Sequence, residues 1–412
     1  MPGASNGYAE PAFITRVRIR NYKSIAACDV ALGPLTFLVG QNGSGKSNFL
    51  DSLRFTADAL RTTLDHAIRD RGGLNEVRRR SKGHPTNFGI ALEFVLPSGP
   101  AGHYAFEIAA RPEVGYEVKR EECRVGSLGE AAYARYVVER GVVKTTTHPG
   151  PAASADRLYL VNVSGLPEFR PVYLALSAMG FYSLNPDRIR DLQSPDAGDL
   201  LQRDGSNIAS VLAQIDRNDP AAKERIEAFL ALVVDGIRGV DVKVLGSKET
   251  LEFRQSVVGD ENPWRFLASN MSDGTLRALG VLVALFQSLA PRSGRILLVG
   301  IEEPEVALHP AAAGVLLDAL RAASHRVQVV VTSHSPDLLD DKHIPAEAIL
   351  AVVAERGITR IVPVDETTRQ ALADHLYTAG ELLRLNQIAP DPDAIEAITT
   401  RQPRLFEVIE AP

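Results

Sequence analysis

This sequence of 412 residues is poor in several features that mark particular protein classes. It contains two cysteines, Cys28 and Cys123, which have no metal-ligand spacing and cannot form a disulfide framework. No apolar run is long enough to span a membrane, since the longest, at 276–289, is interrupted by polar residues. Residues 1–11 lack the basic-then-apolar layout of a signal peptide. We therefore expect a cytoplasmic protein that does not contact a membrane.

Positive charge is not in excess either. The 45 Lys and Arg residues are outnumbered by 51 Asp and Glu residues, which gives a net charge of −6. A surface that is basic overall is therefore excluded, and any contact with nucleic acid needs a local patch. The best candidate is a run of cations after the first predicted helix: Arg69, Arg71, Arg78, Arg79, Arg80 and Lys82. This run either attracts a DNA backbone or forms a solvated loop after a helix C-terminus, where cations are favoured in any case.

Hydrophobic periodicity separates the first half of the chain into two kinds of structure. Strands are expected at 13–20 and 35–39, and a long helix at 46–70. Between 88 and about 192, short apolar segments alternate with Gly and Pro turns. This pattern predicts a lobe made of antiparallel strands.

The second half is expected to begin with helices at 199–215 and 221–234. The last third then alternates between helix and strand: helix 275–289, strand 296–301, helix 311–323, strand 327–332, a helix from Pro336 and strand 348–353. Such alternation predicts a parallel sheet with crossover helices. The length suits two or three domains, or one domain with a large insertion.

A glycine-rich loop lies between the strand at 35–39 and the helix that follows it. Its sequence, Gly40-Gln41-Asn42-Gly43-Ser44-Gly45-Lys46-Ser47, fits the G-x-x-x-x-G-K-[ST] pattern. Glycines allow backbone N–H groups to surround phosphate oxygens at a helix N-terminus, whose dipole favours negative charge. Lys46 is placed to reach the β- and γ-phosphates of a nucleotide, and the Ser47 hydroxyl to ligate magnesium. We therefore expect ATP and Mg²⁺ to bind here.

Two consecutive acids end the predicted strand at 296–301. Glu302 and Glu303 are expected at the carboxyl end of this strand, where ligands bind in a doubly wound sheet. One carboxylate can hold magnesium while its neighbour polarises the attacking water, although acids after a strand are as often solvated loop residues. Glu302 follows Lys46 by 256 positions (302 − 46), which leaves room for an inserted lobe between two halves of one site.

Two further motifs flank these acids. Met271-Ser272-Asp273-Gly274-Thr275 opens the helix at 275–289, and its serine lies 30 residues before Glu302 (302 − 272). Thr332-Ser333-His334-Ser335-Pro336 follows the strand at 327–332, and Ser335 is expected to cap a helix with Pro336 at its first position. Taken singly, these are ordinary helix caps and a loop histidine. Their order and spacing around the two acids favour a functional role.

In this order, the motifs resemble the ABC-like ATPases related to RecF, SMC and OLD (overcoming lysogenization defect) proteins. The resemblance is greatest to compact prokaryotic "AAA family ATPases" of genome maintenance and antiviral defence. It rests on residues 19–24, 40–47, 201–212, 271–277, 302–310, 332–336 and 376–383. The resemblance implies an α/β fold, a P-loop NTPase of the ABC-ATPase type, with a mixed or parallel core sheet and an inserted antiparallel β lobe.

The resemblance also implies roles for residues. Phosphate contacts fall on Asn42, Gly43, Ser44, Gly45, Lys46, Ser47 and Asn48. The signature loop, which in this family contacts the γ-phosphate of the opposite subunit, falls on Ser272, Asp273 and Gly274. Magnesium would be held by Ser47 and Glu302, with Asn185 at the glutamine-loop position. Glu303 would be the general base, and His334 the switch histidine that senses the γ-phosphate.

The chain departs from the family pattern at two points. Glu302 stands where aspartate is usual, and its longer arm makes direct metal contact harder to assume. The signature loop at 271–275 reads Met-Ser-Asp-Gly-Thr rather than Leu-Ser-Gly-Gly-Gln, which indicates that the protein is not a membrane-transporter subunit.

The resemblance predicts four segments: an ATPase half with the phosphate loop at 12–84, an antiparallel β lobe at 85–195, a helical lobe at 196–264 and a second ATPase half at 265–412. We expect a homodimer, or a higher assembly, that acts as an ATP-driven clamp or sensor in antiviral defence or DNA maintenance. A separate nuclease or toxin-like effector is the expected partner, and DNA is a second candidate. The alternative is an OLD-type nuclease acting alone, for which the 78 residues after His334 (412 − 334) are too few to add a Toprim domain.

Overall fold

The computed structural model describes residues 13–80, 86–111, 115–126, 133–260, 262–287 and 296–406. Its large sheet contains β1 (Ile14–Tyr22), β2 (Ile25–Ala31), β3 (Leu35–Val39), β4 (Asn87–Val95), β5 (Ala101–Arg111), β6 (Gly115–Val125), β7 (Ala134–Glu139), β8 (Val142–Thr146), β9 (Gly180–Tyr182), β13 (Leu298–Glu302), β14 (Gln328–Ser333), β15 (Ile349–Glu355) and β16 (Ile358–Pro363). Their order in space is β8-β7-β6-β5-β4-β1-β2-β16-β15-β3-β14-β13-β9. A second sheet is formed by β10 (Ile237–Leu245), β11 (Lys248–Gln255) and β12 (Trp264–Leu267).

The helices of the first half are α1 (Lys46–Arg61), α2 (Leu64–Arg69), α3 (Leu74–Val77), α4 (Tyr159–Asn162), α5 (Arg170–Ser177), α6 (Pro186–Arg190), α7 (Ile208–Asn218) and α8 (Pro220–Val233). Those of the second half are α9 (Asp273–Phe286), α10 (Ala313–Ser324), α11 (Glu366–Ala373), α12 (Ala379–Arg384) and α13 (Pro392–Thr400), with 3₁₀ turns η1 (Ala268–Asn270), η2 (Pro310–Ala312) and η3 (Ala346–Ala348). None of the helices in the described ranges has the length and apolar composition needed to cross a membrane.

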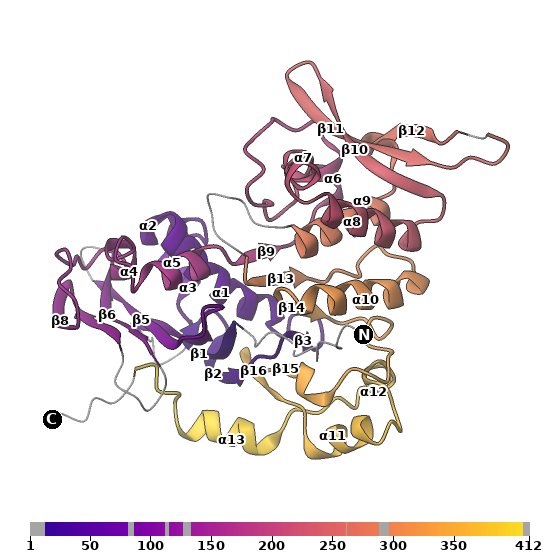
Figure 1. Ribbon diagram of the computed structural model, residues 1–412. Coiled ribbons are helices and arrows are strands. Elements are labelled where there is room, and N and C mark those ends of the chain that lie inside the picture. The colour runs from indigo at the N-terminus through magenta and orange to yellow at the C-terminus, as the bar shows by residue number, and fades with distance from the viewer. Residues whose placement is uncertain are drawn as a thin grey trace, which may run out of the picture.

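The strands at one end of the large sheet are parallel, and both of their faces are buried. β15, β3, β14, β13 and β9 are successive parallel neighbours. On β3, Leu38 packs into a core shared with α1, whereas Phe37 and Val39 pack into a core shared with α9 and α10. Figure 1 shows these helices on opposite sides of the strands. Because the strands are parallel, the loops that follow β3, β13 and β14 meet at one edge of the sheet.

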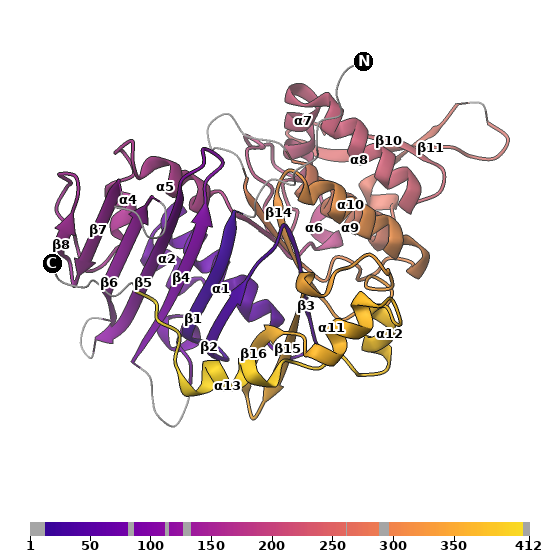
Figure 2. The same ribbon diagram turned by 60° about the horizontal axis from the view of Figure 1, so that its bottom comes forward.

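The other end of the sheet is antiparallel and continuous with the parallel end. β4 pairs with β1, and β5 to β8 extend the sheet from there, side by side in Figure 2. The rings of Tyr22, Phe55 and Phe88 lie 5.4–5.9 Å apart and pack α1 against this part of the sheet. The predicted antiparallel strands are confirmed as β4 to β8, which extend the core sheet. The prediction is wrong for the rest of the lobe, because 159–190 contains α4, α5, α6 and β9, and β9 pairs in parallel with β13.

Five further predicted segments differ from the structure. The helix expected at 46–70 is two helices, because α1 ends at Arg61 and Thr63 then caps α2 by accepting a hydrogen bond from the His66 N–H at 3.0 Å. The stretch 13–39 contains β2 in addition to the two strands expected. The range 196–264 contains α7 and α8 but also β10, β11 and the first residue of β12.

The helix expected at 199–215 begins only at Ile208. Before it, Gly205 has a φ of 81°, and a Cβ there would lie 2.7 Å from Ile189 Cγ1. The side chain of Asn207 accepts a hydrogen bond from the Gln202 N–H at 2.8 Å and holds the preceding residues in a loop. Local hydrogen bonds from such side chains compete with helix formation.

The helix expected from Pro336 is absent, and Ser335 caps nothing. The Leu339 carbonyl accepts a hydrogen bond from the Gly380 N–H at 2.9 Å, and a Cβ on Gly380 would lie 2.2 Å from the Pro336 carbonyl oxygen. Close packing against α12 therefore holds this stretch as a turn. Leu338 and Leu339 are fully buried there.

Candidate functional site

The phosphate loop, residues 40–45, is packed tightly against neighbouring strands. Gly43 and Gly45 have φ angles of 79° and 100°, which favour glycine. A Cβ on Gly45 would lie 2.0 Å from Thr359 Oγ1, and one on Gly40 would lie 2.0 Å from the Val352 carbonyl oxygen. Side chains at these two positions would displace the loop from β15 and β16.

Lys46 is buried at the start of α1 and directed at the loop itself. Its Nζ donates to the carbonyl oxygens of Gly40 at 2.7 Å and Gln41 at 3.0 Å. Burial lowers the pKa of this ammonium group, while the charges of Glu303 and Glu305 act in the opposite direction. Ser44 Oγ is also buried and has no hydrogen-bond partner among the described residues. An ammonium group and an unpaired hydroxyl inside the loop fit an anionic phosphate.

A chain of hydrogen bonds braces this loop from behind. Asn48 Nδ2 donates to Ser24 Oγ at 2.6 Å, and Ser24 Oγ lies 2.7 Å from Thr359 Oγ1. Thr359 in turn donates to the Ser44 carbonyl at 2.8 Å. Sequence patterns had not singled out Thr359, because no motif surrounds it. Asn48 thus has a structural partner, and its contact with nucleotide stays a prediction.

The proposed base and the switch histidine lie together at the ends of β13 and β14. Glu303 has a φ of 44°, and its N–H donates to the Thr332 carbonyl at 3.0 Å. His334 Nδ1 lies 3.2 Å from Glu303 Oε1. Both side chains are about one-third exposed, at 38% and 36%. The structure therefore brings these two predicted residues within reach of one ligand atom.

Glu305 is a third acid at this edge, and its role was not predicted. Ser333 Oγ donates to its Oε1 at 2.6 Å, whereas Oε2 is buried without a hydrogen-bond partner in the described part of the chain. Burial raises the pKa of this carboxyl group, while the Ser333 hydrogen bond lowers it less. Its signal in the sequence is a Glu-Pro-Glu repeat at 303–305, which leaves open which glutamate faces the ligand.

The two candidate magnesium ligands come from the first turn of α1 and the end of β13. Ser47 is exposed on the first turn of α1, and Glu302 is 21% exposed at the carboxyl end of β13. Both offer oxygen atoms, the ligands that Mg²⁺ prefers. The described residues contain no group of three or more His, Cys, Asp or Glu side chains that could hold a metal ion, so Mg²⁺ would rely on phosphate and water for its other ligands.

Asn185, the candidate for the glutamine-loop position, follows β9 and caps α6. Its Oδ1 accepts a hydrogen bond from the Asp187 N–H at 2.9 Å. β9 is the parallel neighbour of β13, so this residue lies one strand away from Glu302. Its part in metal binding stays a prediction.

The signature loop lies at the N-terminus of α9. Ser272 caps the helix by accepting from the Thr275 N–H at 3.2 Å, and it is exposed together with Asp273. Arg190 binds the Asp273 carboxylate at 2.5 Å. A Cβ on Gly274 would lie 2.6 Å from the Ala307 carbonyl oxygen. Across the described ranges, no hydrogen bond or ion pair joins this loop to the phosphate loop of the same chain.

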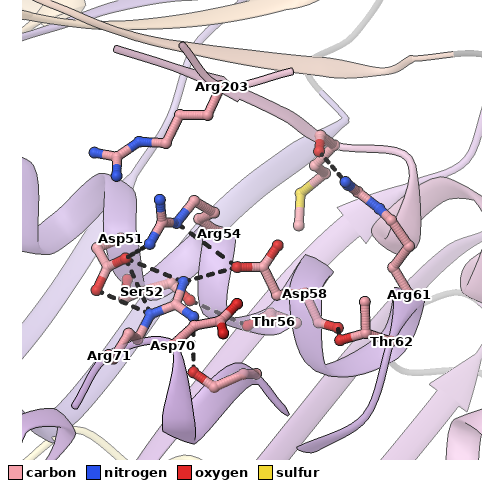
Figure 3. A network of polar contacts seen from close by, with 12 residues as sticks. Asp51, Ser52, Arg54, Thr56, Asp58, Arg61, Thr62, Asp70, Arg71 and Arg203 are labelled. Atoms are coloured by element: carbon pink, nitrogen blue, oxygen red, sulfur yellow. Dashed lines mark hydrogen bonds and ion pairs between the residues drawn. The ribbon is translucent and has the colours of Figure 1, made fainter. Parts of the chain in front are cut away.

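The basic run predicted as a DNA contact is divided by the fold. The Arg71 side chain is only 2% exposed and binds Asp51 at 3.0 Å and Asp58 at 2.9 Å, in the network of Figure 3. The expected contact with DNA is therefore wrong for Arg71, whose side chain is buried and ion-paired inside the protein. Arg69 and Arg80 are exposed, and Arg69 pairs with Asp65 at 2.9 Å, whereas Arg78 and Arg79 are half-buried. Lys82 lies outside the described residues.

Two family models match the chain. One, described as "AAA domain, putative AbiEii toxin, Type IV TA system", matches residues 183–340. The other, described as "AAA ATPase domain", matches residues 13–95. No curated protein matches the chain.

Solved structures of SMC head domains share its fold. An SMC head bound to the C-terminal winged-helix domain of ScpA is 14% identical, with a TM-score of 0.51, over 86% of this chain and 99% of that chain. The Pyrococcus furiosus SMC head with an extended coiled coil, bound to the C-terminal domain of ScpA, is 12% identical, with a TM-score of 0.53, over 88% of this chain and 99% of that chain. At these identities the likeness shows the fold. The phosphate loop and the acids at the end of β13 fall inside the two AAA-domain matches, so the chain carries AAA-type ATPase domains in a fold shared with SMC heads.

Proposed function

We propose that two copies of this protein close over ATP and Mg²⁺, hydrolyse the ATP and so act as a clamp or sensor. The observation that carries this proposal is that the candidate ATP-binding residues form two separate groups within one chain. Lys46, Glu303 and His334 gather at one edge of the sheet. Ser272 is exposed at the N-terminus of another helix, and in the described residues it has no hydrogen bond to any of the three. A helix N-terminus favours a phosphate group, and a second copy can supply one.

Each residue has a distinct task in this proposal. Lys46 exchanges its two carbonyl partners for the β- and γ-phosphates of ATP. Bound Mg²⁺ supplies charge neutralisation at the phosphates, with Ser47 and Glu302 as its protein ligands. Glu303 orients the attacking water and takes its proton, and His334, 3.2 Å away, contacts the γ-phosphate.

The biological role that we propose is antiviral defence or DNA maintenance with a separate effector protein. The description of the matched AAA domain as a putative AbiEii toxin of a type IV system supports a toxin-like partner. The SMC heads of similar fold are described as bound to ScpA domains, which supports use of this fold to bind a partner protein. DNA is a second candidate partner, through the exposed Arg69 and Arg80 and the half-buried Arg78 and Arg79.

The Glu303→Gln variant tests the proposal. Glutamine keeps the size of the side chain but is a far poorer base, so ATP should still bind while turnover falls by roughly two or more orders of magnitude. Because ATP joins the two copies, the variant should accumulate as an ATP-dependent dimer, measured by light scattering. Glu396 is an exposed residue of α13, so Glu396→Gln is the matched control and should behave as the wild type.

Three outcomes would contradict the proposal. Wild-type turnover in Glu303→Gln together with inactive Glu305→Gln would place the base on Glu305. Wild-type turnover in the Gln variants of Glu302, Glu303 and Glu305 alike would show that the protein is no hydrolase of this kind. A monomer at saturating ATP in an otherwise inactive Glu303→Gln variant would exclude closure of two copies.

A further inference from the structure

One cation contacts the acid that the proposed function assigns to magnesium. Arg203 Nη2 lies 2.7 Å from Glu302 Oε1. The arginine side chain is 47% exposed and that of the glutamate 21%. The sequence gives no hint of this pair, since the two residues are 99 positions apart.

The backbone of Arg203 is held firmly beside β9, the strand next to β13. Its carbonyl accepts a hydrogen bond from the Ser183 N–H at 2.9 Å, and the Asp204 carbonyl accepts one from the Asn185 N–H at 3.1 Å. The same loop ends at Asn207, immediately before α7. These hydrogen bonds hold the backbone at Arg203 in place, so the arginine can leave Glu302 only by a movement of its side chain.

The side chain has space into which it can move. Arg203 lines a cavity of about 880 Å³ together with Arg54, Asp58 and Asp204. Figure 3 shows Arg203 on the same side of α1 as Arg54 and Asp58, with Asp51 nearby. The acids that line this cavity offer the guanidinium group other partners once it leaves Glu302.

We propose that Arg203 is a gate on the magnesium position: it neutralises Glu302 when the site is empty, and Mg²⁺ that arrives with ATP must displace it. This inference rests on the proposed function, in which Glu302 is the metal-binding acid. A guanidinium group at 2.7 Å competes for the same carboxylate oxygen and repels a divalent cation beside it. Arg203 is a positioning residue in this scheme, since it acts through Glu302.

The consequence is a link between nucleotide and the lobe formed by α7, α8 and β10 to β12. While Arg203 binds Glu302, the loop that leads into α7 is tied to the end of β13. Occupation of the site by Mg²⁺ and ATP removes that tie. The contact between Arg203 and Glu302 therefore links the lobe to the end of β13 only when the nucleotide site is empty.

The test is the Mg²⁺ concentration needed for half-maximal binding of a fluorescent ATP analogue. Arg203→Gln should lower it about two- to fivefold, the range expected for loss of one partly exposed ion pair. Binding without Mg²⁺ should stay unchanged. Arg203→Lys, which keeps the charge, should restore most of the wild-type requirement. Arg188→Gln is the matched control, because Arg188 is 60% exposed and lies beside the same loop, 3.9 Å from Asp204.

A double variant separates this proposal from the proposed function. If Glu302 binds the metal, Glu302→Gln alone should raise the Mg²⁺ requirement, and adding Arg203→Gln should change nothing further. An unchanged or raised requirement in Arg203→Gln, with Glu302→Gln still impaired, would overturn the gate alone. No effect of Glu302→Gln would overturn the metal assignment and the gate with it. Equal melting temperatures without nucleotide confirm that the variants are folded.

Discussion

His334 and Glu303 approach each other from neighbouring parallel strands, with 3.2 Å between Nδ1 and Oε1. This nitrogen makes no hydrogen bond in the described structure, so it is close to the carboxylate without being aligned to it. A histidine placed in this way is free to turn toward a third group between them. The γ-phosphate of ATP and its attacking water are the groups that the proposed function places there.

The first prediction concerns this histidine. His334→Ala should bind ATP normally but hydrolyse it about 10- to 100-fold more slowly, which is the worth of one charge-assisted hydrogen bond in the transition state. Phosphate release at saturating ATP measures the effect. His325→Ala, an exposed histidine just after α10, is the control and should keep the wild-type rate. Unchanged turnover in His334→Ala would remove this residue from the reaction.

The second prediction concerns the buried ammonium group of Lys46. Lys46→Ala removes the strong cationic partner of the β- and γ-phosphates, so calorimetry should detect no ATP binding at concentrations that saturate the wild type. The exposed Lys342→Ala should bind ATP as the wild type does. Equal affinities in Lys46→Ala and the wild type would rule out the assignment of the phosphate loop.

The third prediction is that Ser272 acts on the ATP bound by the other copy. Lys46→Ala and Ser272→Arg should each be inactive when alone, because both ATP sites of such a dimer contain the substituted residue. In a mixed dimer, one site would combine the two intact halves, and mixing should restore activity to about half at most. Dimer exchange is verified with differently tagged chains. If mixed dimers form and stay inactive, the site is not shared between copies.

The fourth prediction concerns the stability of α1. Burial alone would raise the pKa of Asp51, but the charges of Arg71, Lys23 and Arg54 outweigh burial and place this pKa well below its ordinary value. Asp51 therefore stabilises the fold as a carboxylate. Asp51→Asn should cost about 3 kcal/mol in the free energy of unfolding at pH 7, since it removes one of the two carboxylates that the buried Arg71 binds and leaves only Asp58.

The same variant has a predicted pH dependence. A carboxylate whose pKa is lower in the folded state stabilises fully above its unfolded pKa of about 4, and it loses this effect as pH falls toward the folded value. The wild-type advantage over Asp51→Asn should thus be constant above about pH 5 and shrink below about pH 4. Urea unfolding at several pH values measures it. Asp65→Asn, at an exposed pair, should cost no more than about 0.5 kcal/mol, and an equal cost at both positions would refute the argument.

Sequence patterns predicted the core strands that carry the site better than they predicted the segments whose conformation depends on distant residues. The strands at 35–39 and 327–332 match β3 and β14, because both faces of these strands are buried and leave a continuous apolar run. The helix predicted after Pro336 is absent because local sequence signals did not decide the conformation there. Its cap and its proline were local signals, and packing against Gly380, a distant residue, decided the conformation.

The sequence by itself determined the phosphate loop, the two acids and the order of the motifs. Each of these depends on residues that are neighbours in the chain and on the backbone that glycine, serine and proline impose locally. The tertiary structure alone decided that Arg71 is buried against Asp51, that Thr359 braces the loop and that Arg203 faces Glu302. These partners lie on different elements, and a charge has no preferred partner until packing has brought the candidates together and excluded water.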